Sequence, residues 1–460
     1  MTSPVRAVSV FGLGKLGLTL ASCIADSKQH TVGFDPDKAL VGSINAGTAQ
    51  SVEPGVLDRL HRGQASGHFT ATDSAEQATA ETDISFIVVP TPSNVLGGFS
   101  NIFVLEACRA IGAACRAKQT DHTIVVVSTM LPGSSIHSII PAIEEGAGRA
   151  LGDRLGYCYS PSFIALGEVV KGIETPDYLL VGEADSDAGN AVLDVMNQVV
   201  RNNAPVARMS PTEAEIAKIA SNTHETMRVS FANMLFSLCS EIPGVDVDRV
   251  TEALTFRMGK RFFKGATPYG GPCWPRDNRA LSAVMAAIGV PNRLPHTIDL
   301  VNADHGQYIL RRILGMTRPG QAVGVLGLAY KPGTPVSDHA FGIDLARWLA
   351  GERRRVVAWD PSLSMEAARE ALGPSIEIAG TAEECLGESE LAVLTIPLAE
   401  FARVKWASAA KATIVDCWRC LPQAAIAAVG QYCALGRGPD TDIDEWLAGE
   451  IGQRIGLLTN

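Results

Sequence analysis

The sequence predicts an α/β fold in which two Rossmann-like, doubly wound domains are joined by a central helical domain with a long helix. Short apolar runs alternate with helical segments in the first 208 residues and again after residue 308, as expected for parallel sheets covered on both faces. Residues from about 210 to 305 contain no convincing strand. We therefore expect three domains, at 1–208, 209–308 and 309–460.

The first α/β half opens with AVSVFGLG at residues 7–14, a β-rich run that ends in glycines and precedes a helical segment. Further strands of this half are expected at 31–35, 83–90 and 123–129. The same order recurs late in the chain, where strands are expected at 322–330, 355–362, 390–397 and 413–418. Only the first half carries a full glycine fingerprint.

The central segment opens with a helix-start signal, in which Ser210 and Glu213 can form a capping box around Pro211. A helical period then continues for some thirty residues. The second half of this long helix is apolar on much of its circumference, which indicates packing against another chain as well as against its own domains. We expect a homodimer or a higher homo-oligomer.

Composition excludes several classes of protein. The 460-residue chain has a formal net charge of −10, which argues against bulk attraction to nucleic acid or to an anionic membrane. No apolar run approaches the roughly 18 to 20 residues of a membrane span, and the N-terminus offers no signal peptide. The scattered cysteines are typical of a reducing compartment. We expect a cytoplasmic protein without a metal site, in which any anionic substrate meets a few cations placed for it.

A glycine-rich motif, GLGKLG, spans residues 12–17 between a strand and a helix. Its glycines permit a tight turn and the close approach of a pyrophosphate to the backbone. Asp35 closes the second strand, where a carboxylate would accept hydrogen bonds from ribose hydroxyls. No arginine follows Asp35 to neutralise a 2′-phosphate, so NAD is favoured over NADP. A glycine-rich turn that binds nothing is the alternative.

Two more motifs end predicted strands, PTP at 90–92 and STMLPG at 128–133. Ligands of open α/β sheets lie beyond the carboxyl ends of the strands, so both motifs are placed to contact cofactor or substrate. The alternative is that they only connect a strand to a loop. The predicted cofactor-binding residues are Gly12, Gly14, Lys15, Leu16, Gly17, Asp35, Pro90, Thr91 and Thr129.

The segment GGPCWPRDNRAL, at residues 270–281, combines a cysteine with turn-forming residues and charges. Arg276 follows Cys273 closely, and a nearby cation favours the thiolate, which is the nucleophilic form. On residues alone, a buried structural cysteine is the alternative. Lys218 and Asn222 lie one helical turn apart and could together hold an oxyanion, whereas a solvated lysine is the alternative there.

Over nearly its full length the chain resembles the UDP-glucose/GDP-mannose dehydrogenase family. The matching motifs occur in the family's order: FGLGKLGL, INAG with EPG, VVPTP, STMLPG, SPSFIALGE with TPDYLLVG, AEIAKIASN, RMGKRFFKGATPYGGPCWPRDNRAL and LGLAYKPGT. The resemblance implies an N-terminal NAD domain, a central helical dimerisation domain and a C-terminal domain that binds the nucleotide sugar. It also implies a four-electron oxidation of a C6 alcohol to an acid, with two NAD consumed and a thioester on the cysteine.

The resemblance assigns roles residue by residue. Cys273 matches the nucleophile, Lys218 and Asn222 match the groups that stabilise the oxyanion, Asp277 matches the carboxylate that works with the lysine, and Thr129 matches a threonine at the reacting centre. The positions that match substrate contacts, beyond Lys218 and Asn222, are Arg257, Phe262, Lys264, Tyr269, Gly270, Gly271, Lys331 and, by a looser alignment, Arg419. The arginine that matches Arg257 reaches into the partner subunit's site in relatives.

The chain also departs from the family pattern. Ser162 and Leu166 stand where relatives carry two glutamates, which are implicated in proton management and thioester hydrolysis. Asp338 replaces an arginine near the cofactor phosphates, and Arg276 replaces a lysine. Glu168 is a nearby carboxylate, but its spacing does not suit a direct replacement.

Two other functions stay open. An enzyme of this fold could stop at the aldehyde or act on an unusual nucleotide sugar, which the missing glutamates favour. A non-catalytic protein that binds NAD and a nucleotide sugar is the second alternative, and the cysteine and its neighbours argue against it. UDP-glucose is the default substrate implied by the resemblance.

Overall fold

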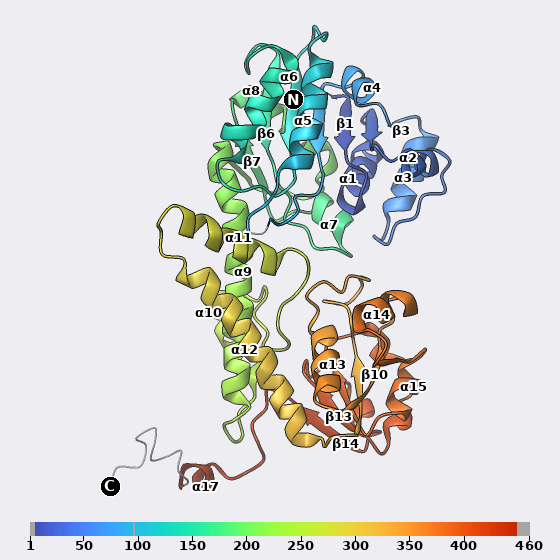
Figure 1. Ribbon diagram of the computed structural model, residues 1–460, viewed down its shortest axis with the longest axis vertical. Coiled ribbons are helices and arrows are strands. Elements are labelled where there is room, and N and C mark those ends of the chain that lie inside the picture. The colour runs from blue at the N-terminus through green and yellow to red at the C-terminus, as the bar shows by residue number, and fades with distance from the viewer. Residues whose placement is uncertain (1–4, 95–96, 449–460) are drawn as a thin grey trace. The chain divides into compact units, whose positions relative to one another are not determined.

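A computed structural model describes residues 5–94 and 97–448 of the chain. The described residues form two compact units, one of those up to 221 together with 283–290, and the other of 222–282 together with those from 291 onward. Each unit is built around one sheet flanked by helices, and the stretch of sequence from β8 to β9 is helical (Figure 1). The predicted fold class is confirmed, while the boundaries at 208 and 308 stay predictions.

The first sheet has eight strands in the order β3-β2-β1-β4-β5-β6-β7-β8. Neighbouring strands are parallel except β6 and β7, and the first six follow the Rossmann order. The strands are β1 (Val8–Phe11), β2 (Thr31–Phe34), β3 (Phe69–Thr72), β4 (Ile84–Ile87), β5 (His122–Val126), β6 (Leu155–Tyr159), β7 (Leu179–Glu183) and β8 (Val206–Met209). The helices are α1 (Lys15–Asp26), α2 (Lys38–Asn45), α3 (Val56–Ala65), α4 (Ala75–Ala80), α5 (Ile102–Cys115), α6 (Ile140–Ala147), α7 (Val169–Glu174) and α8 (Ser186–Val199), with a π-helix, η1 (Ser135–Ile139).

Both faces of this sheet are covered, which explains its near-continuous apolar strands. On β5, Val125 packs into the core formed with α1, α3 and α8, whereas Ile124 and Val126 pack into the core formed with α5 and α6. All three side chains are fully buried. The alternation of side chains along the strand therefore fills two separate cores.

Four long helices follow: α9 (Pro211–Cys239), α10 (Val247–Met258), α11 (Trp274–Ala287) and α12 (Arg293–Met316). Helix α9 spans 29 residues and begins with the predicted capping box, in which the Glu213 carboxylate accepts from the Ser210 amide at 2.8 Å. Its first part, to Ser221, belongs to the first unit and the rest to the second. In the second unit, Phe236 of α9 and Ile309 of α12 join the core of the second sheet.

The second sheet has six parallel strands in the order β11-β10-β9-β12-β13-β14, again the Rossmann order. The strands are β9 (Ala322–Leu326), β10 (Arg355–Trp359), β11 (Glu377–Ile378), β12 (Leu391–Leu394), β13 (Thr413–Asp416) and β14 (Gln431–Ala434). The helices are α13 (Phe341–Gly351), α14 (Met365–Leu372), α15 (Ala382–Gly387), α16 (Gln423–Ile426) and α17 (Ile443–Ala448), with 3₁₀ turns η2 (Ala399–Ala402) and η3 (Trp406–Ala409). The predicted second α/β half is thereby confirmed.

Candidate active site

The glycine turn after β1 has the geometry of a phosphate cradle. Gly12 has a φ of +93°, and a Cβ atom there would lie 2.4 Å from the Val88 carbonyl oxygen. A Cβ atom at Gly17 would lie 1.8 Å from the Gly12 carbonyl oxygen, so both positions need glycine. A Cβ atom at Gly14, just before α1, would meet nothing within 4 Å, which leaves its backbone open to a pyrophosphate at the helix N-terminus.

Asp35 lies directly beside this turn. One carboxylate oxygen accepts from the Leu13 amide at 2.8 Å and the other from the Asp37 amide at 3.0 Å. The side chain is only partly buried, and each oxygen can accept a second hydrogen bond. The open backbone at Gly14 and the remaining acceptors of Asp35 suit the pyrophosphate and a ribose of NAD.

The second sheet repeats this turn in altered form. A Cβ atom at Gly342 would lie 1.9 Å from the Gly327 carbonyl oxygen, which mirrors the contact between Gly17 and Gly12. Asp360 accepts from the Leu328 amide at 2.7 Å, as Asp35 does from Leu13. However, Asp360 is buried, and it also accepts from the amides of Ala329, Ser362 and Leu363. Its carboxylate is committed to the backbone, so this turn lacks the acceptor that a ribose would need.

The predicted residues at the ends of β4 and β5 lie next to each other. Ser128 joins the two strand ends, because its hydroxyl donates to the Val89 carbonyl at 2.6 Å and accepts from the Val89 amide at 2.9 Å. Pro90 and Thr91 follow Val89, and Thr129 follows Ser128. Thr91 is buried, whereas Thr129 is partly exposed. Ser128 was not singled out from the sequence, although it belongs to the STMLPG motif.

Lys218 is buried in the first unit, with 7% of its surface exposed, so the solvated lysine considered from the sequence is wrong. Its ammonium donates to the Ser162 carbonyl oxygen at 2.7 Å and lies 4.5 Å from the centre of the Phe163 ring. The segment that replaces the family's glutamate-bearing loop therefore holds the lysine through its backbone.

The remainder of that loop is also anchored. Leu166 packs against the first unit's apolar core, in the same cluster as Leu16. The buried Glu53 carboxylate accepts from the Gly167 amide at 2.9 and 2.8 Å, an anchor that sequence reasoning missed although Glu53 begins the EPG motif. Glu168 is exposed and pairs with Lys171 at 3.1 Å. Neither Leu166 nor Glu168 thus reproduces a buried catalytic carboxylate.

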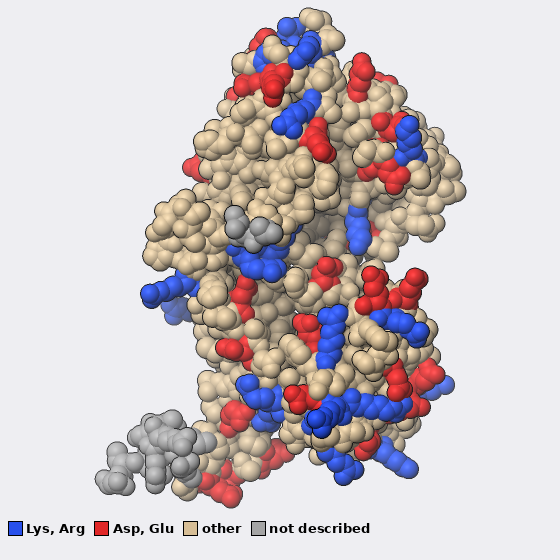
Figure 2. All heavy atoms as spheres, viewed as in Figure 1, with Lys and Arg blue, Asp and Glu red and all other residues tan. Residues whose placement is uncertain are grey.

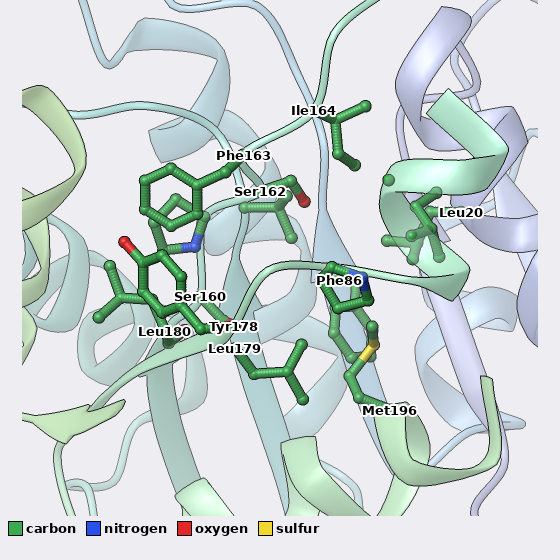
Figure 3. A pocket seen from close by; sticks show the side chains of 15 residues that line it. Leu20, Phe86, Ser160, Ser162, Phe163, Ile164, Tyr178, Leu179, Leu180 and Met196 are labelled. Carbon is green, nitrogen blue, oxygen red and sulfur yellow. The ribbon is translucent and has the colours of Figure 1, made fainter. Parts of the chain in front are cut away.

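A small cavity of about 40 Å³ lies behind residues 160–164 (Figure 3). Its lining is mostly apolar and includes Leu20, Phe86 and Met196, with Ser162 and Phe163 on the loop side. The space is enough for about one water molecule. It is far too small for a nucleotide sugar, so it is not the substrate site.

In the second unit, Cys273 directly precedes α11 and its carbonyl accepts from the Asp277 amide at 2.8 Å. It is the one exposed residue among the ten cysteines, so the buried structural cysteine considered from the sequence is wrong. The N-terminus of a helix favours negative charge at this position. The location suits an accessible nucleophile.

Behind Cys273 lies a buried polar group that joins α9 to α11. Asn222 donates to the fully buried Asp277 carboxylate at 2.6 Å, and Arg276 donates to the other carboxylate oxygen at 3.0 Å. On the next residue, the Asn278 amide donates to Asp299 at 2.9 Å and to the Tyr269 hydroxyl at 3.2 Å. Asn222, Asp277 and Tyr269 are therefore held in fixed positions.

The turn that carries Cys273 rests on the loop after β9. Gly271 has a φ of +85°, and its amide donates to the Asp338 carbonyl at 2.9 Å. A Cβ atom at Gly271 would lie 2.7 Å from the Tyr330 ring, and one at Gly270 would lie 2.1 Å from the His339 carbonyl oxygen. Because Lys331 follows Tyr330, the predicted nucleotide-contacting lysine and the cysteine turn belong to one packed assembly. Asp338, which stands in place of the family's arginine, contributes its backbone to this assembly, and its side chain is exposed.

The remaining predicted substrate residues differ in their availability. Arg257 and Phe262 are exposed near the end of α10, and Lys264 lies 4.0 Å from the Asp248 carboxylate. Arg419 has a 1% exposed side chain and makes five hydrogen bonds, to both Asp248 oxygens and to the carbonyls of Gly265, Cys417 and Leu435. A guanidinium has five N–H donors. The structure thus does not leave Arg419 a donor for a substrate.

Comparison with known proteins places the chain in a family. Profiles of the UDP-glucose/GDP-mannose dehydrogenase family match residues 6–200 (NAD binding domain), 212–304 (central domain) and 324–423 (UDP binding domain). The chain belongs to this family. It is an NAD-dependent nucleotide-sugar dehydrogenase, as the resemblance in sequence predicted.

Individual relatives agree. A UDP-glucose 6-dehydrogenase of Haloferax volcanii is 31% identical over 404 residues, which cover 86% of this chain and 92% of the relative. A GDP-mannose 6-dehydrogenase of Pseudomonas aeruginosa is 29% identical, over 75% of this chain and 79% of its own. The solved structure of a UDP-glucose dehydrogenase from Pyrobaculum islandicum is 31% identical with a TM-score of 0.85, over 95% of this chain and 98% of that one.

The surface fits a protein that binds its anionic ligand locally. Acidic and basic side chains are interspersed on the face that Figure 2 shows. None of the helices within residues 5–94 and 97–448 is both long and apolar enough to cross a lipid bilayer.

Proposed function

We propose that the chain oxidises the C6 primary alcohol of a nucleotide sugar to the acid through a covalent intermediate on Cys273, with UDP-glucose as the default substrate. The observation that carries the proposal is the position of Cys273, exposed at the N-terminus of α11 and backed by the buried Asn222–Asp277 pair. The two relatives at 31% identity are both named as UDP-glucose dehydrogenases, which supports the default substrate.

The proposed reaction removes four electrons from the sugar in two oxidation steps. The alcohol loses a hydride and a proton to become an aldehyde, and the Cys273 thiol adds to the aldehyde to form a thiohemiacetal. Loss of a second hydride and proton gives a thioester, and water then releases the acid and restores the thiol. NAD held by the GLGKLG turn and Asp35 would supply the acceptor for each hydride, so two molecules would be reduced per sugar.

The chain's own groups have defined roles in this scheme. Lys218 and Asn222 stabilise the oxygen anion that develops on the sugar, Asp277 orients Asn222 through the 2.6 Å hydrogen bond, and Thr129 contacts the reacting centre. Arg257, Phe262, Lys264, Tyr269, Gly270, Gly271 and Lys331 are proposed to hold the nucleotide sugar. Arg419 is instead proposed to have a structural role, because its donors are already engaged by protein acceptors.

One panel of nucleotide sugars with NAD tests the proposal, with NADH and product mass followed together. UDP-glucose, UDP-N-acetylhexosamines and GDP-mannose should be compared. Cys273→Ser should abolish acid formation and leave NAD binding intact, because a serine hydroxyl is a far weaker nucleophile than a thiolate. Cys420→Ser is the matched control, since that thiol is partly buried and burial raises its pKa to about 12. Unchanged acid production by Cys273→Ser would rule out covalent catalysis there.

A two-electron reaction that stops at the aldehyde is the second candidate. It is favoured by Ser162 and Leu166, which stand where relatives carry glutamates. Ser162 holds Lys218 through its carbonyl, and Leu166 packs against an apolar core. One NADH per sugar consumed would establish this candidate, and two would establish the four-electron reaction. A protein that binds both ligands and produces no NADH would establish the non-catalytic alternative.

We also propose a cytoplasmic homodimer. Four apolar side chains of α9 are exposed by 36 to 54%, and their spacing of four, three and four residues places them on one stripe of the helix: Met227, Phe231, Met234 and Leu238. We propose that the same stripe of a second copy of the chain packs against it. All ten cysteines are free thiols, including the Cys-x-x-Cys pair Cys417 and Cys420, which supports a reducing compartment.

A further inference from the structure

Glu215 is a buried carboxylate for which the scheme above has no role. It lies on α9, three residues before Lys218, and none of its surface is exposed. It accepts hydrogen bonds from the Gly133 amide at 2.6 Å, the Ser135 amide at 2.8 Å and the Ser135 hydroxyl at 2.6 Å. All three donors belong to the segment that follows β5 and contains Thr129, at Gly133 in the loop and at Ser135, the first residue of η1.

The donors require two acceptor oxygens. Two of them are backbone amides that bind different oxygens of Glu215, and an amide N–H can only donate. A glutamine would place its own N–H₂ group against one of these amides, so the contact depends on two acceptor oxygens. Burial raises the pKa of Glu215, and the hydrogen bonds from Ser135 and Gly133 offset only part of this rise.

The loop is held in an unusual shape by these bonds. Gly133 has a φ of +91°, so its amide can turn toward α9 in a conformation that other residues rarely adopt. The Ser135 hydroxyl also lies 2.7 Å from the Tyr157 hydroxyl, which links the loop to β6. Strand β6 leads into the segment whose Ser162 carbonyl binds Lys218.

We propose that Glu215 is a positioning residue, whose carboxylate ties the Thr129 loop to the turn of α9 that carries Lys218. The tie fixes the separation of two side chains on which the reaction depends, because one end is anchored at Gly133 and Ser135 and the other lies one helical turn from Lys218. This inference rests on the proposed function, in which Thr129 and Lys218 both act at the reacting carbon.

Glu215→Gln tests the tie, because it keeps the size of the side chain and removes one acceptor. We expect kcat to fall about 10-fold to 100-fold, as a misplacement of about 1 Å can cause. The dissociation constant for NAD should stay within about twofold, because the GLGKLG turn and Asp35 bind the adenosine half. A residue that only supports folding would lower stability and leave the kcat of the folded enzyme unchanged.

Glu213→Gln is the matched control. Glu213 lies on the same helix, is exposed, and serves the capping box, in which glutamine is also suitable. Its kcat should equal that of the wild type. Ser135→Ala removes one donor and leaves both backbone amides, so its kcat should fall less than in Glu215→Gln. The kcat of the double variant, with Glu215→Gln and Ser135→Ala, should fall by less than the product of the two single-variant factors. A fall equal to that product would mean that the two residues act independently and would overturn the tie.

Hydrogen exchange gives a readout that does not depend on turnover. Amides of residues 129–135 should exchange faster in Glu215→Gln than in the wild type and in Glu213→Gln. Unchanged exchange would overturn the tie even if the proposed function holds. If the wild-type enzyme oxidises no nucleotide sugar while the exchange rises as expected, the proposed function fails and the tie stands. Faster exchange with unchanged kcat would overturn the positioning role.

Discussion

The Arg419 guanidinium binds the Asp248 carboxylate with two hydrogen bonds, of 2.8 and 2.9 Å, across 171 residues of sequence. Burial acts to raise the pKa of Asp248, but the hydrogen bonds and positive charge of Arg419 hold it below its ordinary value. Arg419 itself adopts a φ of +53° and donates to three backbone carbonyls as well. This pair therefore joins α10 to the end of β13 within the second unit.

We predict that Arg419→Lys lowers stability and leaves substrate affinity unchanged. A lysine retains the charge but cannot make five hydrogen bonds, so the free energy of unfolding should fall by about 3 kcal/mol. Urea unfolding measures this effect, and the KM for the nucleotide sugar should stay within about twofold. Arg437→Lys is the control, since the Arg437–Asp246 pair is half exposed and should contribute less than about 1 kcal/mol. A raised KM with unchanged stability would instead make Arg419 a substrate contact.

Cofactor choice should depend on Asp35. Asp35→Ala removes the acceptor for ribose hydroxyls and the negative charge that repels a 2′-phosphate. We expect the KM for NAD to rise and the preference over NADP to narrow, in steady-state assays with each cofactor. Asp37→Ala is the control, because Asp37 instead caps α2 by accepting from the Ala39 amide at 2.9 Å. If the wild-type enzyme uses NADP at least as efficiently as NAD, this prediction is wrong.

The stripe on α9 should control assembly. Phe231 is 40% exposed in the single chain, and Phe231→Asp places a charge on the apolar stripe, so the variant should be a monomer by light scattering. Met365→Asp, on α14, is the control, because Met365 is similarly exposed but lies outside the stripe. An active wild-type monomer at assay concentration would contradict the dimer.

Stability should fall at mildly acidic pH because of His122. Burial, helped by the nearby Lys118, lowers the pKa of His122 to about 3. The unfolded chain therefore binds a proton at this histidine below about pH 6.5, whereas the folded chain does so only near pH 3. This contribution to stability is complete above about pH 6.5 and is lost as pH falls toward 3. Between about pH 7 and pH 5 the loss should approach about 2 kcal/mol.

Urea unfolding at the two pH values checks this expectation. His122→Gln should flatten the pH dependence without abolishing it, because buried His305 has a pKa lowered to about 4 for the same reason. The exposed His61 supplies the control, and His61→Gln should keep the wild-type dependence. An unchanged dependence in His122→Gln would contradict the assignment.

The elements of the fold differ in how far the sequence could predict them. The strands that form the two sheet centres were predicted because burial on both faces makes their sequences continuously apolar. Six strands were missed, namely β3, β6, β7, β8, β11 and β14. Of these, β8 alternates between exposed and half-buried residues and β11 has only two residues, so neither carries such a signal. The glycine turn and Asp35 were predicted because their spacing is local and chemically specific.

The tertiary partners could not be predicted in the same way. The contact of Gly271 with Asp338 and that of Glu53 with Gly167 join segments far apart in the chain, and neither has a local period or motif of its own. The family motifs contain all four residues or their neighbours, but a motif does not say which groups meet. Only the folded chain shows that Arg419 is already saturated by protein acceptors.

The loss of the family's glutamates should make release of the acid slow. Hydrolysis of a thioester needs a water molecule made nucleophilic by a base, and such assistance is worth about 10²-fold to 10⁴-fold in rate. Leu166 packs into an apolar core, and Glu168 is paired with Lys171 at the surface. We therefore predict a pre-steady-state burst of NADH and an acyl-enzyme on Cys273, detected by mass spectrometry of the intact protein.

Leu166→Glu should restore the missing base. Lys218 and Asp277 already serve the oxidation of the alcohol, so that step does not need the new carboxylate. The substitution should therefore speed steady-state turnover more than it changes the burst. Leu166→Gln has the same size without the charge, so it should disturb the packing of the loop equally and give no increase in turnover. Brisk acid production by the wild type without a burst or an adduct would show that another group, such as Glu168 or Asp338, activates the water. Aldehyde as the only product would show that the reaction transfers two electrons and that the thioester does not form.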